Sequence, residues 1–158
     1  MTDEDDHAAA AMVSLRRIIR YLRLGDRETE IASGLSSAQL FVLTTLAESP
    51  AISVAEVAKR ALTDQSSVST VVARLVKRGL VARKPAAKDK RRAELRITPA
   101  GNRILAAAPP VPQARLIEAI RSLPAGRRAE LVRALDALVD AVGAEGVKPR
   151  LFFEDEKA

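Results

Sequence analysis

The sequence has no cysteine, only one histidine, and few aromatic residues, which make up 3% of its 158 residues. The absence of cysteine excludes disulfides, thiolate metal sites and thiol redox sensing. One histidine, His7, is too few for a zinc site, so we expect neither a metal nor a cofactor. The scarcity of aromatics disfavours a β-sandwich and a protein that stacks bases on aromatic platforms.

Long apolar runs are also lacking: none approaches the roughly 20 residues that span a bilayer. The residues Met1–Asp6 lack the basic and apolar regions of a signal peptide. We therefore expect a cytoplasmic protein without a membrane partner. No nucleophile elbow, phosphate loop or metal-ligand spacing is present, and His7 stands in an acidic stretch, so we expect no enzymatic activity.

Positive charge is concentrated in the middle of the chain. Between Lys59 and Arg96 there are twelve basic and three acidic residues, a net charge of +9 against +6 for the whole chain. A local basic patch is the electrostatic feature expected of a polyanion-binding protein, although charged runs are also common on ordinary solvated surfaces.

Helical periodicity dominates the N-terminal part. Residues 1–7 are expected to be a disordered acidic N-terminus, and residues 8–34 a first helix with its connection. Apolar residues at helical spacing run from Ala8 to about Arg27, and Gly25 is expected to end or break the helix. A second helix is expected between a cap at Ser36 or Ser37 and the stop at Ser49-Pro50. Its inner face is expected to carry Leu40, Leu43, Thr44 and Ala47.

Two short helices with a tight connection follow, as in a helix-turn-helix. The stretch Ser53–Glu56 has the pattern of a capping box, in which each residue's side chain bonds the other's backbone amide. Thr63 or Asp64 then caps a helix that runs to Arg78 and closes at Gly79, so we predict a recognition helix at about 64–78.

The next segment predicts a β-wing at about 80–97. Residues 80–84 and 93–97 are short strand candidates around a basic loop. Residues 35–98 thus form the expected DNA-binding unit, and residues 99–145 the expected C-terminal dimerisation helices. These begin at Thr98-Pro99, are broken by the prolines at 109, 110 and 112, and end with a leucine stripe; residues 146–158 form a tail. The predicted fold is therefore mainly α with a small β-wing.

One face of the predicted recognition helix carries small, hydroxylated and basic residues suited to the major groove. The candidate DNA-binding residues are Ser66, Ser67, Ser69, Thr70, Arg74 and Lys77. Gln65 could read adenine, but its position on the helical wheel lies nearer the buried side. Capping and solvation are an equally ordinary explanation for the serines.

The loop of the wing indicates DNA binding more specifically than the helix does. Its five residues are Lys88, Asp89, Lys90, Arg91 and Arg92, of which only Asp89 is acidic and the other four are basic. A narrow minor groove attracts inserted Arg or Lys. Asp89 is expected to order the loop by accepting hydrogen bonds or pairing with Arg91.

These segments resemble the MarR (multiple antibiotic resistance regulator) family. The run Asp89–Arg92 matches the family's D-x-R-R wing signature, Ser67–Val81 is similar to its recognition helix and exit, and Leu95–Gly101 resembles its entry to the dimer helix. The resemblance covers about residues 8–145. The sequence departs from the family pattern in two places. Thr70 stands where many relatives have arginine, and the proline cluster interrupts a helix that is usually long.

The resemblance implies a winged helix-turn-helix regulator, usually a repressor, that binds a palindromic operator as a homodimer and often responds to a small-molecule effector. The implied major-groove contacts are those of Ser66, Ser69, Thr70 and Arg74, and Arg91 enters the minor groove. First- and last-helix residues form the implied dimer interface: Leu15, Ile18, Leu22, Leu131, Leu135 and Leu138. No effector-binding residues are predicted.

Two alternatives stay open. Winged helices also serve as protein-interaction modules, although such modules usually lose the basic wing that is present here. An architectural DNA binder, or a regulator without effector control, would need the same basic residues. The sequence alone does not decide between these last two and an effector-controlled repressor.

Overall fold

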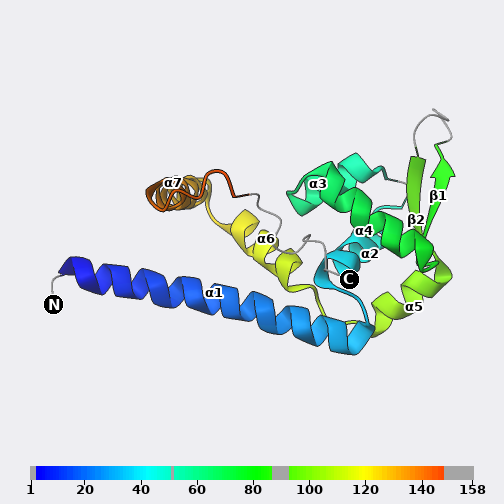
Figure 1. The fold of residues 1–158 in the computed structure, drawn as a ribbon, viewed down its shortest axis with the longest axis horizontal. Helices are drawn as coiled ribbons and strands as arrows, with labels where there is room; N and C mark the ends of the chain where they lie inside the picture. The colour runs from blue at the N-terminus through cyan, green and yellow to red at the C-terminus, as the bar shows by residue number, and fades with distance from the viewer. Residues whose placement is uncertain (1–2, 51, 87–92, 148–158) are drawn as a thin grey trace.

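The computed structural model describes residues 3–50, 52–86 and 93–147. Figure 1 shows a long N-terminal helix running beneath a group of short helices and a two-stranded sheet. The elements in chain order are α1 (Asp3–Ser33), α2 (Ser37–Glu48), α3 (Val54–Ala61), α4 (Gln65–Lys77), β1 (Val81–Pro85), β2 (Ala93–Ile97), α5 (Pro99–Ala107), α6 (Pro112–Ser122) and α7 (Ala125–Ala141). The expected fold class, mainly α with a small β-wing, is confirmed.

The hydrophobic core lies where α2 meets α4, β1 and β2. Leu40, Leu43, Val68, Leu75 and Leu95 are all fully buried there. Because α2 is buried around most of its circumference, it forms the centre of this lobe, and the other elements pack around it. Ala47, which we expected on the inner face of α2, is exposed instead.

Most helix starts in this lobe are capped by the side chains that the sequence predicts. Ser36 caps α2 in a reciprocal capping box with Gln39. The Ser53 hydroxyl accepts a hydrogen bond from the Glu56 amide at 3.2 Å, but the return bond is not made, because the Glu56 carboxylate pairs with Arg60 at 3.4 Å. Thr98 accepts from the Gly101 amide at the start of α5. Side-chain caps of this kind satisfy amides that the helix itself leaves unbonded.

The sheet is a single antiparallel pair in which Val81 faces Ile97 and Pro85 faces Ala93. The pair is tied to the core by the Leu95 amide, which donates to the Ile52 carbonyl at 2.9 Å. The Thr98 hydroxyl donates to the Gly79 carbonyl at 2.8 Å. The base of the sheet is thereby joined both to the segment before α3 and to the end of α4.

Helix α1 is longer than the sequence predicts. It begins at Asp3, so residues 3–7, expected to be disordered, are helical, and it continues through Gly25 to Ser33. Gly25 does not break the helix. A side chain there would overlap the Pro112 ring at the start of α6, so the glycine allows the two helices to approach closely. The helix ends instead at Gly34, whose φ of +65° is the left-handed conformation of a C-terminal cap.

The proline cluster separates α5 from α6, as expected: α5 ends at Ala107 and α6 starts at Pro112. Helix α7 follows after Pro124 and has no buried residue among those described. In Figure 1 it stands at the opposite end of the molecule from the sheet.

Candidate nucleic-acid interface

Helix α4 has one buried and one exposed face. Its buried face consists of valine and leucine: Val68, Val71, Val72 and Leu75. Its exposed face carries the predicted Ser66, Ser69, Thr70 and Lys77, and Arg74 is half-buried at the flank. The middle of the exposed face carries the small side chains of Ser66, Ser69 and Thr70, so the backbone there could come close to a groove floor. Gln65 is also exposed, so the expectation that it lies towards the core is wrong.

Ser67 does not belong to this face. Its side chain is buried at 6% exposure, and its hydroxyl donates to the Asp64 carboxylate at 2.7 Å. Its amide also donates to Asp64, at 2.9 Å. Ser67 and Asp64 thus form the N-terminal cap of α4, and the prediction that Ser67 is a DNA-binding residue is not supported by its position.

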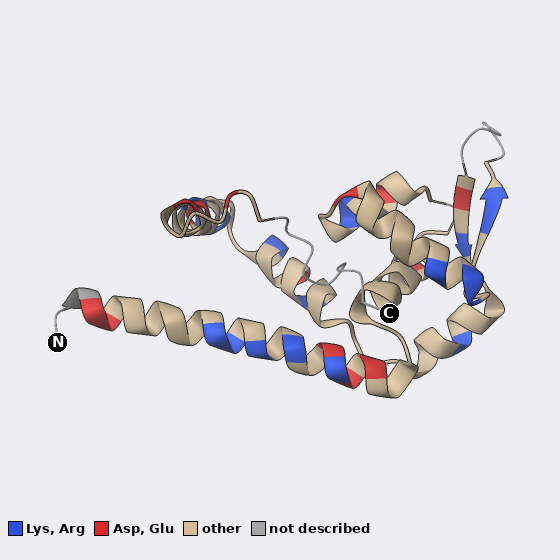
Figure 2. Ribbon diagram, in the orientation of Figure 1, with Lys and Arg blue, Asp and Glu red and all other residues tan. Residues whose placement is uncertain are grey.

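Basic side chains extend this face towards the sheet. Arg83 and Lys84 on β1 are exposed, and Arg96 on β2 is exposed and pairs with Glu94 at 3.2 Å. Figure 2 shows these basic residues of the strands beyond the basic end of α4. The predicted wing residues Lys88, Asp89, Lys90, Arg91 and Arg92 lie outside the described residues.

The two short helices are joined by a turn with one unusual residue. Leu62 has a φ of +54°, in the left-handed region, and its side chain is 68% exposed. For a residue with a branched side chain this conformation is unfavourable. The turn nevertheless places α3 against α4, which the two-helix motif requires.

The predicted dimer residues fall into three groups by exposure. Ile18 on α1 is 43% exposed, and Leu135 and Leu138 on α7 are 41% and 50% exposed. Leu15 and Leu131 are half-buried. Leu22, by contrast, is only 6% exposed within the single chain, so it is occupied by packing in its own protomer and is not a free interface residue.

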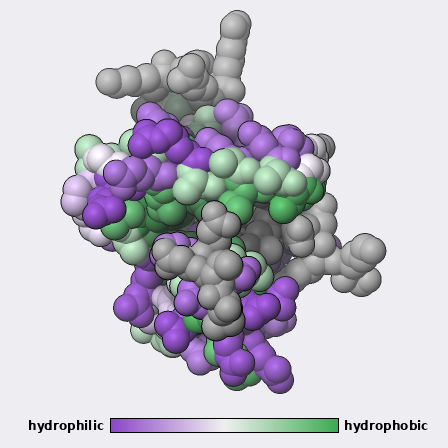
Figure 3. Space-filling view, turned by 90° about the vertical axis from the view of Figure 1, so that its left-hand side faces the viewer, coloured by the Kyte–Doolittle hydropathy of each residue, from purple (hydrophilic) through white to green (hydrophobic). Residues whose placement is uncertain are grey.

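Apolar exposure continues along both helices beyond the predicted positions. On α7, Val132 and Val139 are also exposed, and Figure 3 shows apolar side chains gathered in a band along this helix. On α1 the same holds for Ile19, Leu24 and Ile31. Exposed apolar surface of this extent is typical of an interaction surface.

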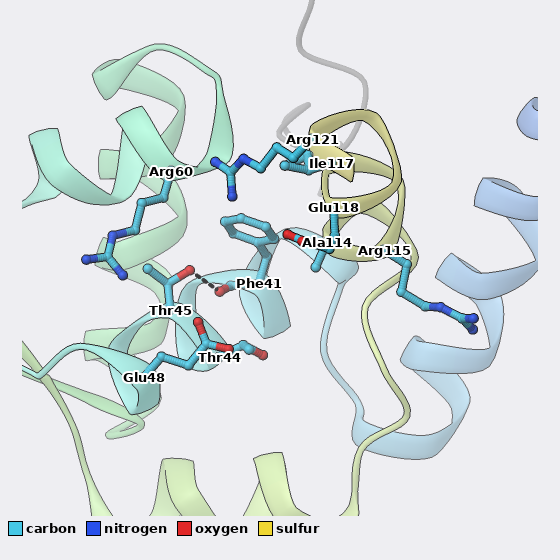
Figure 4. Close-up of a pocket in the computed structure, with 10 residues that line it drawn as sticks. All are labelled: Phe41, Thr44, Thr45, Glu48, Arg60, Ala114, Arg115, Ile117, Glu118 and Arg121. Carbon is cyan, nitrogen blue, oxygen red and sulfur yellow. Dashed lines mark hydrogen bonds between the residues drawn. The ribbon is translucent and has the colours of Figure 1, made fainter. Parts of the chain in front are cut away.

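A cavity of about 490 Å³ lies between α2, α3 and α6, and no local sequence signal pointed to it. Figure 4 shows Phe41, Thr45 and Ile117 among the residues that line it, with Arg60 on the α3 side and Arg121 on the α6 side. The hydroxyl of Thr45 is used within its own helix, where it donates to the Phe41 carbonyl at 2.9 Å. The size is that of an ordinary small-molecule site.

Several polar groups are buried where α1 meets α2. Burial raises the pKa of the Asp26 carboxyl above its usual value of 3.8, and the neighbouring Ser37 hydroxyl lowers it by less. Within the part of the chain that the structure describes, neither Asp26 Oδ1 nor Ser37 Oγ has a well-aligned hydrogen-bond partner, and the same is true of Thr29 Oγ1. A carboxylate in such surroundings is disfavoured relative to the neutral acid.

Comparison with known proteins agrees with the geometry. Residues 33–92, which span the end of α1 to the wing, match the sequence model of the MarR family. This segment, which includes the two short helices and the first strand, is therefore similar to the MarR family. Among curated relatives, an uncharacterized HTH-type transcriptional regulator of Mycobacterium leprae is 28% identical over 90% of this chain and 97% of its own length. The repressor MdtR of Bacillus subtilis is 29% identical over 65% of this chain and 66% of its own length.

Solved MarR-type structures share the fold. BpsR of Bordetella bronchiseptica, described as regulated in its DNA binding by 6-hydroxynicotinic acid, is 28% identical, with a TM-score of 0.54 over 82% of this chain and 98% of the solved chain. The chain is thus similar in sequence and fold to transcriptional regulators of the MarR type. Among the described residues, none of its helices has the length and apolarity to cross a membrane, and no group of three metal-binding side chains is assembled.

Proposed function

We propose that this protein is a cytoplasmic repressor that binds a palindromic DNA operator as a homodimer and is released from it by a small-molecule effector. The observation that carries the proposal is the division of α4 into a buried valine-leucine face and an exposed face of small, hydroxylated and basic residues. A helix with this division is anchored to its own core while its other face is free to enter the major groove.

Within the proposal, Ser66, Ser69 and Thr70 contact base edges and phosphates. The Thr70 hydroxyl already donates to the Ser66 carbonyl at 3.2 Å, which leaves the oxygen able to accept a further hydrogen bond. Lys77, Arg83 and Lys84 contact phosphates, which fixes the position of the protein on DNA without selecting a sequence. The wing residue Arg91 enters the minor groove, with Asp89 holding the loop in shape.

Dimerisation is supported by the apolar side chains that α1 and α7 expose in the single chain. Ile18 on α1 and Leu135 and Leu138 on α7 are exposed. In Figure 1, α7 stands at the opposite end of the molecule from the sheet. Pairing two protomers through these helices would cover this surface and leave both copies of α4 free. A twofold dimer of this kind presents its recognition helices about 34 Å apart, one turn of B-DNA, which favours a palindromic operator.

Effector control is supported by the cavity between α2, α3 and α6 and by the regulation of the relative BpsR by a small molecule. Helix α3 belongs to the DNA-binding motif, whereas α6 leads directly into α7. A ligand that spreads these helices would change the separation of the two recognition helices, and both half-sites would lose contacts together.

The test is a titration of the purified protein against its own gene's upstream DNA and a scrambled duplex, across a salt series. We expect strong preference for the upstream DNA. Lys77→Ala should weaken binding to both duplexes about equally and reduce the salt slope by about 1, because one phosphate contact is lost. Arg91→Ala should act similarly.

The matched control is Arg133→Ala on α7, an exposed arginine at a distance from the DNA-binding face, which should leave binding and the salt slope unchanged. Equal affinity for both duplexes would instead indicate an architectural DNA binder. Absence of binding to either would contradict the DNA-binding proposal and favour a protein-interaction module.

A further inference from the structure

The end of α4 carries two exposed cationic side chains in adjacent positions, Lys77 and Arg78. The Arg78 guanidinium donates a hydrogen bond from Nη1 to the Gly34 carbonyl at 3.0 Å, across 44 positions of the chain. The Lys77 ammonium has no hydrogen-bond or ion-pair partner among the described residues. Lys77 is therefore free to meet a phosphate, whereas Arg78 is directed back towards α1.

The Gly34 carbonyl lies at the C-terminal end of α1, where carbonyl groups lack partners within the helix. Gly34 follows the last residue of α1 and has a φ of +65°, and its amide donates to the Glu30 carbonyl at 2.8 Å. The last turn of α1 contains no basic residue, although the C-terminal end of a helix dipole favours a cation. Arg78 supplies that cation from another helix.

The end of α4 is held from its other side as well. The Thr98 hydroxyl donates to the Gly79 carbonyl at 2.8 Å, and the Thr98 amide donates to the Leu80 carbonyl at 3.0 Å. The Arg78 amide donates to the Arg74 carbonyl at 3.0 Å, so Arg78 is itself joined to the last turn of α4. The end of α4 is thus fixed between the end of α1 and the base of the sheet.

Helix α1 is continuous over 31 residues, about 46 Å, and it carries exposed apolar side chains of the proposed dimer face. It packs against α2, α5 and α6, and the Arg78 bond joins its end to α4. In a dimer built on α1, the direction of α4 relative to α1 in each protomer sets the separation of the two recognition helices.

We propose that Arg78 is a positioning residue, which fixes the direction of α4 relative to α1 and does not contact DNA. The inference rests on the proposed function, in which α4 reads the major groove. Base contacts depend on the placement of Ser66, Ser69 and Thr70, whereas phosphate contacts carry no sequence information. Loss of the Arg78 bond therefore lowers specificity, and loss of Lys77 lowers affinity for every sequence.

The first test measures the direction of α4 without DNA. The natural chain has no cysteine, so Glu28→Cys on the exposed side of α1 and Ser69→Cys on the exposed face of α4 accept two nitroxide spin labels. Labelled chain is mixed with an excess of unlabelled chain, and pulsed electron paramagnetic resonance gives the distance within one protomer. Adding Arg78→Met should broaden the distance distribution, whereas the matched change Lys77→Met should leave it unchanged.

The second test compares the same two methionine variants, without labels, in the titration of upstream and scrambled duplexes across a salt series. Arg78→Met should reduce the preference for the upstream DNA by roughly fivefold or more, the loss expected for one disturbed base contact, at an unchanged salt slope. Lys77→Met should weaken binding to both duplexes equally and reduce the salt slope by about 1. Both side chains are exposed, and circular dichroism verifies that both variants fold.

A distance distribution that broadens in both variants, or in neither, would overturn the positioning role. A salt slope reduced by about 1 in Arg78→Met, with equal losses on the two duplexes, would make Arg78 a phosphate contact and the proposal wrong. If the natural chain binds neither duplex, the proposed function fails, while the distance measurement still decides whether Arg78 fixes α4 against α1.

Discussion

The lobe built on α2 and the helix α7 are opposites in how they use their apolar residues. In the lobe, Leu40, Leu43 and Leu75 are completely buried by other elements of the same chain. In α7, Leu135 and Leu138 are equally apolar but remain 41% and 50% exposed. The lobe therefore has a hydrophobic core of its own, whereas α7 has an apolar face that needs a second surface to cover it.

The largest effect is expected from a cavity in the self-contained lobe. Leu75→Ala removes a side chain with no exposed surface and should lower the free energy of unfolding by about 2–5 kcal/mol, through lost burial and the void left behind. Urea denaturation followed by circular dichroism measures the change. Leu138→Ala on α7 is the contrasting variant, measured at a protein concentration low enough for the chain to be monomeric. A loss of similar size in the monomer would mean that the two regions do not differ as described.

The next effect concerns assembly rather than folding. Leu135→Asp places a charge in the apolar face of α7, so it should convert the proposed dimer to a monomer while the far-ultraviolet circular dichroism stays the same. Light scattering gives the mass. Ala137→Asp adds the same charge on a different side of α7 and should stay dimeric; a dimer in the Leu135→Asp variant would remove α7 from the interface.

A smaller effect is expected at the turn of the helix-turn-helix motif. Leu62→Gly removes the steric penalty of the left-handed backbone at a φ of +54°. It should raise the free energy of unfolding by about 1 kcal/mol. The gain is reduced by the greater conformational entropy of glycine in the unfolded chain. Thermal unfolding detects the gain. Leu62→Ala is the control: it removes the exposed side chain but keeps the backbone penalty, so an equal gain from alanine would point to the side chain instead.

The smallest effect is expected at Asp26, which is only partly buried. Its pKa is raised in the folded state above the usual 3.8, so the folded protein holds this proton more tightly than the unfolded chain. Stability should therefore fall as pH rises from 3.8 through the raised folded pKa, and the loss is complete above it. Asp26→Asn should be more stable than wild type at pH 7, and the two midpoints in urea should converge below pH 3.8.

An Asp26→Asn variant that is less stable than wild type at neutral pH would show that the charged form is favoured in the folded state. Glu28→Gln, on the exposed part of α1, controls for the loss of one negative charge. It should not alter the pH dependence of unfolding.

Local features of the fold could be predicted from sequence because their causes are local. Asp64 and Thr98 cap the helices that they precede, and a glycine follows the end of α4, since side-chain caps and left-handed termini act within a few residues. The strand at Ala93–Ile97 followed from alternation alone. Likewise, the exposed face of α4 followed from helical periodicity.

The errors arose where distant residues decide the outcome. Gly25 looked like a helix end, but its role is to accommodate Pro112, which only the tertiary structure brings beside it. Ser67 is the exception, because the reason there is local: its hydroxyl donates to Asp64, three residues earlier, and its side chain is buried. The cavity could not be predicted from the sequence, because Phe41, Arg60 and Arg121 come from three different helices and share no regular spacing in the sequence.

The bond from the Leu95 amide to the Ile52 carbonyl has a consequence for how such proteins diverge. It anchors β2 to the lobe below the wing loop, and Thr98 anchors the strand's far end to Gly79. Neither of these two bonds involves a residue of the loop between the strands. An engineer who grafts another loop at residues 87–92 would therefore leave both anchors of the hairpin unchanged.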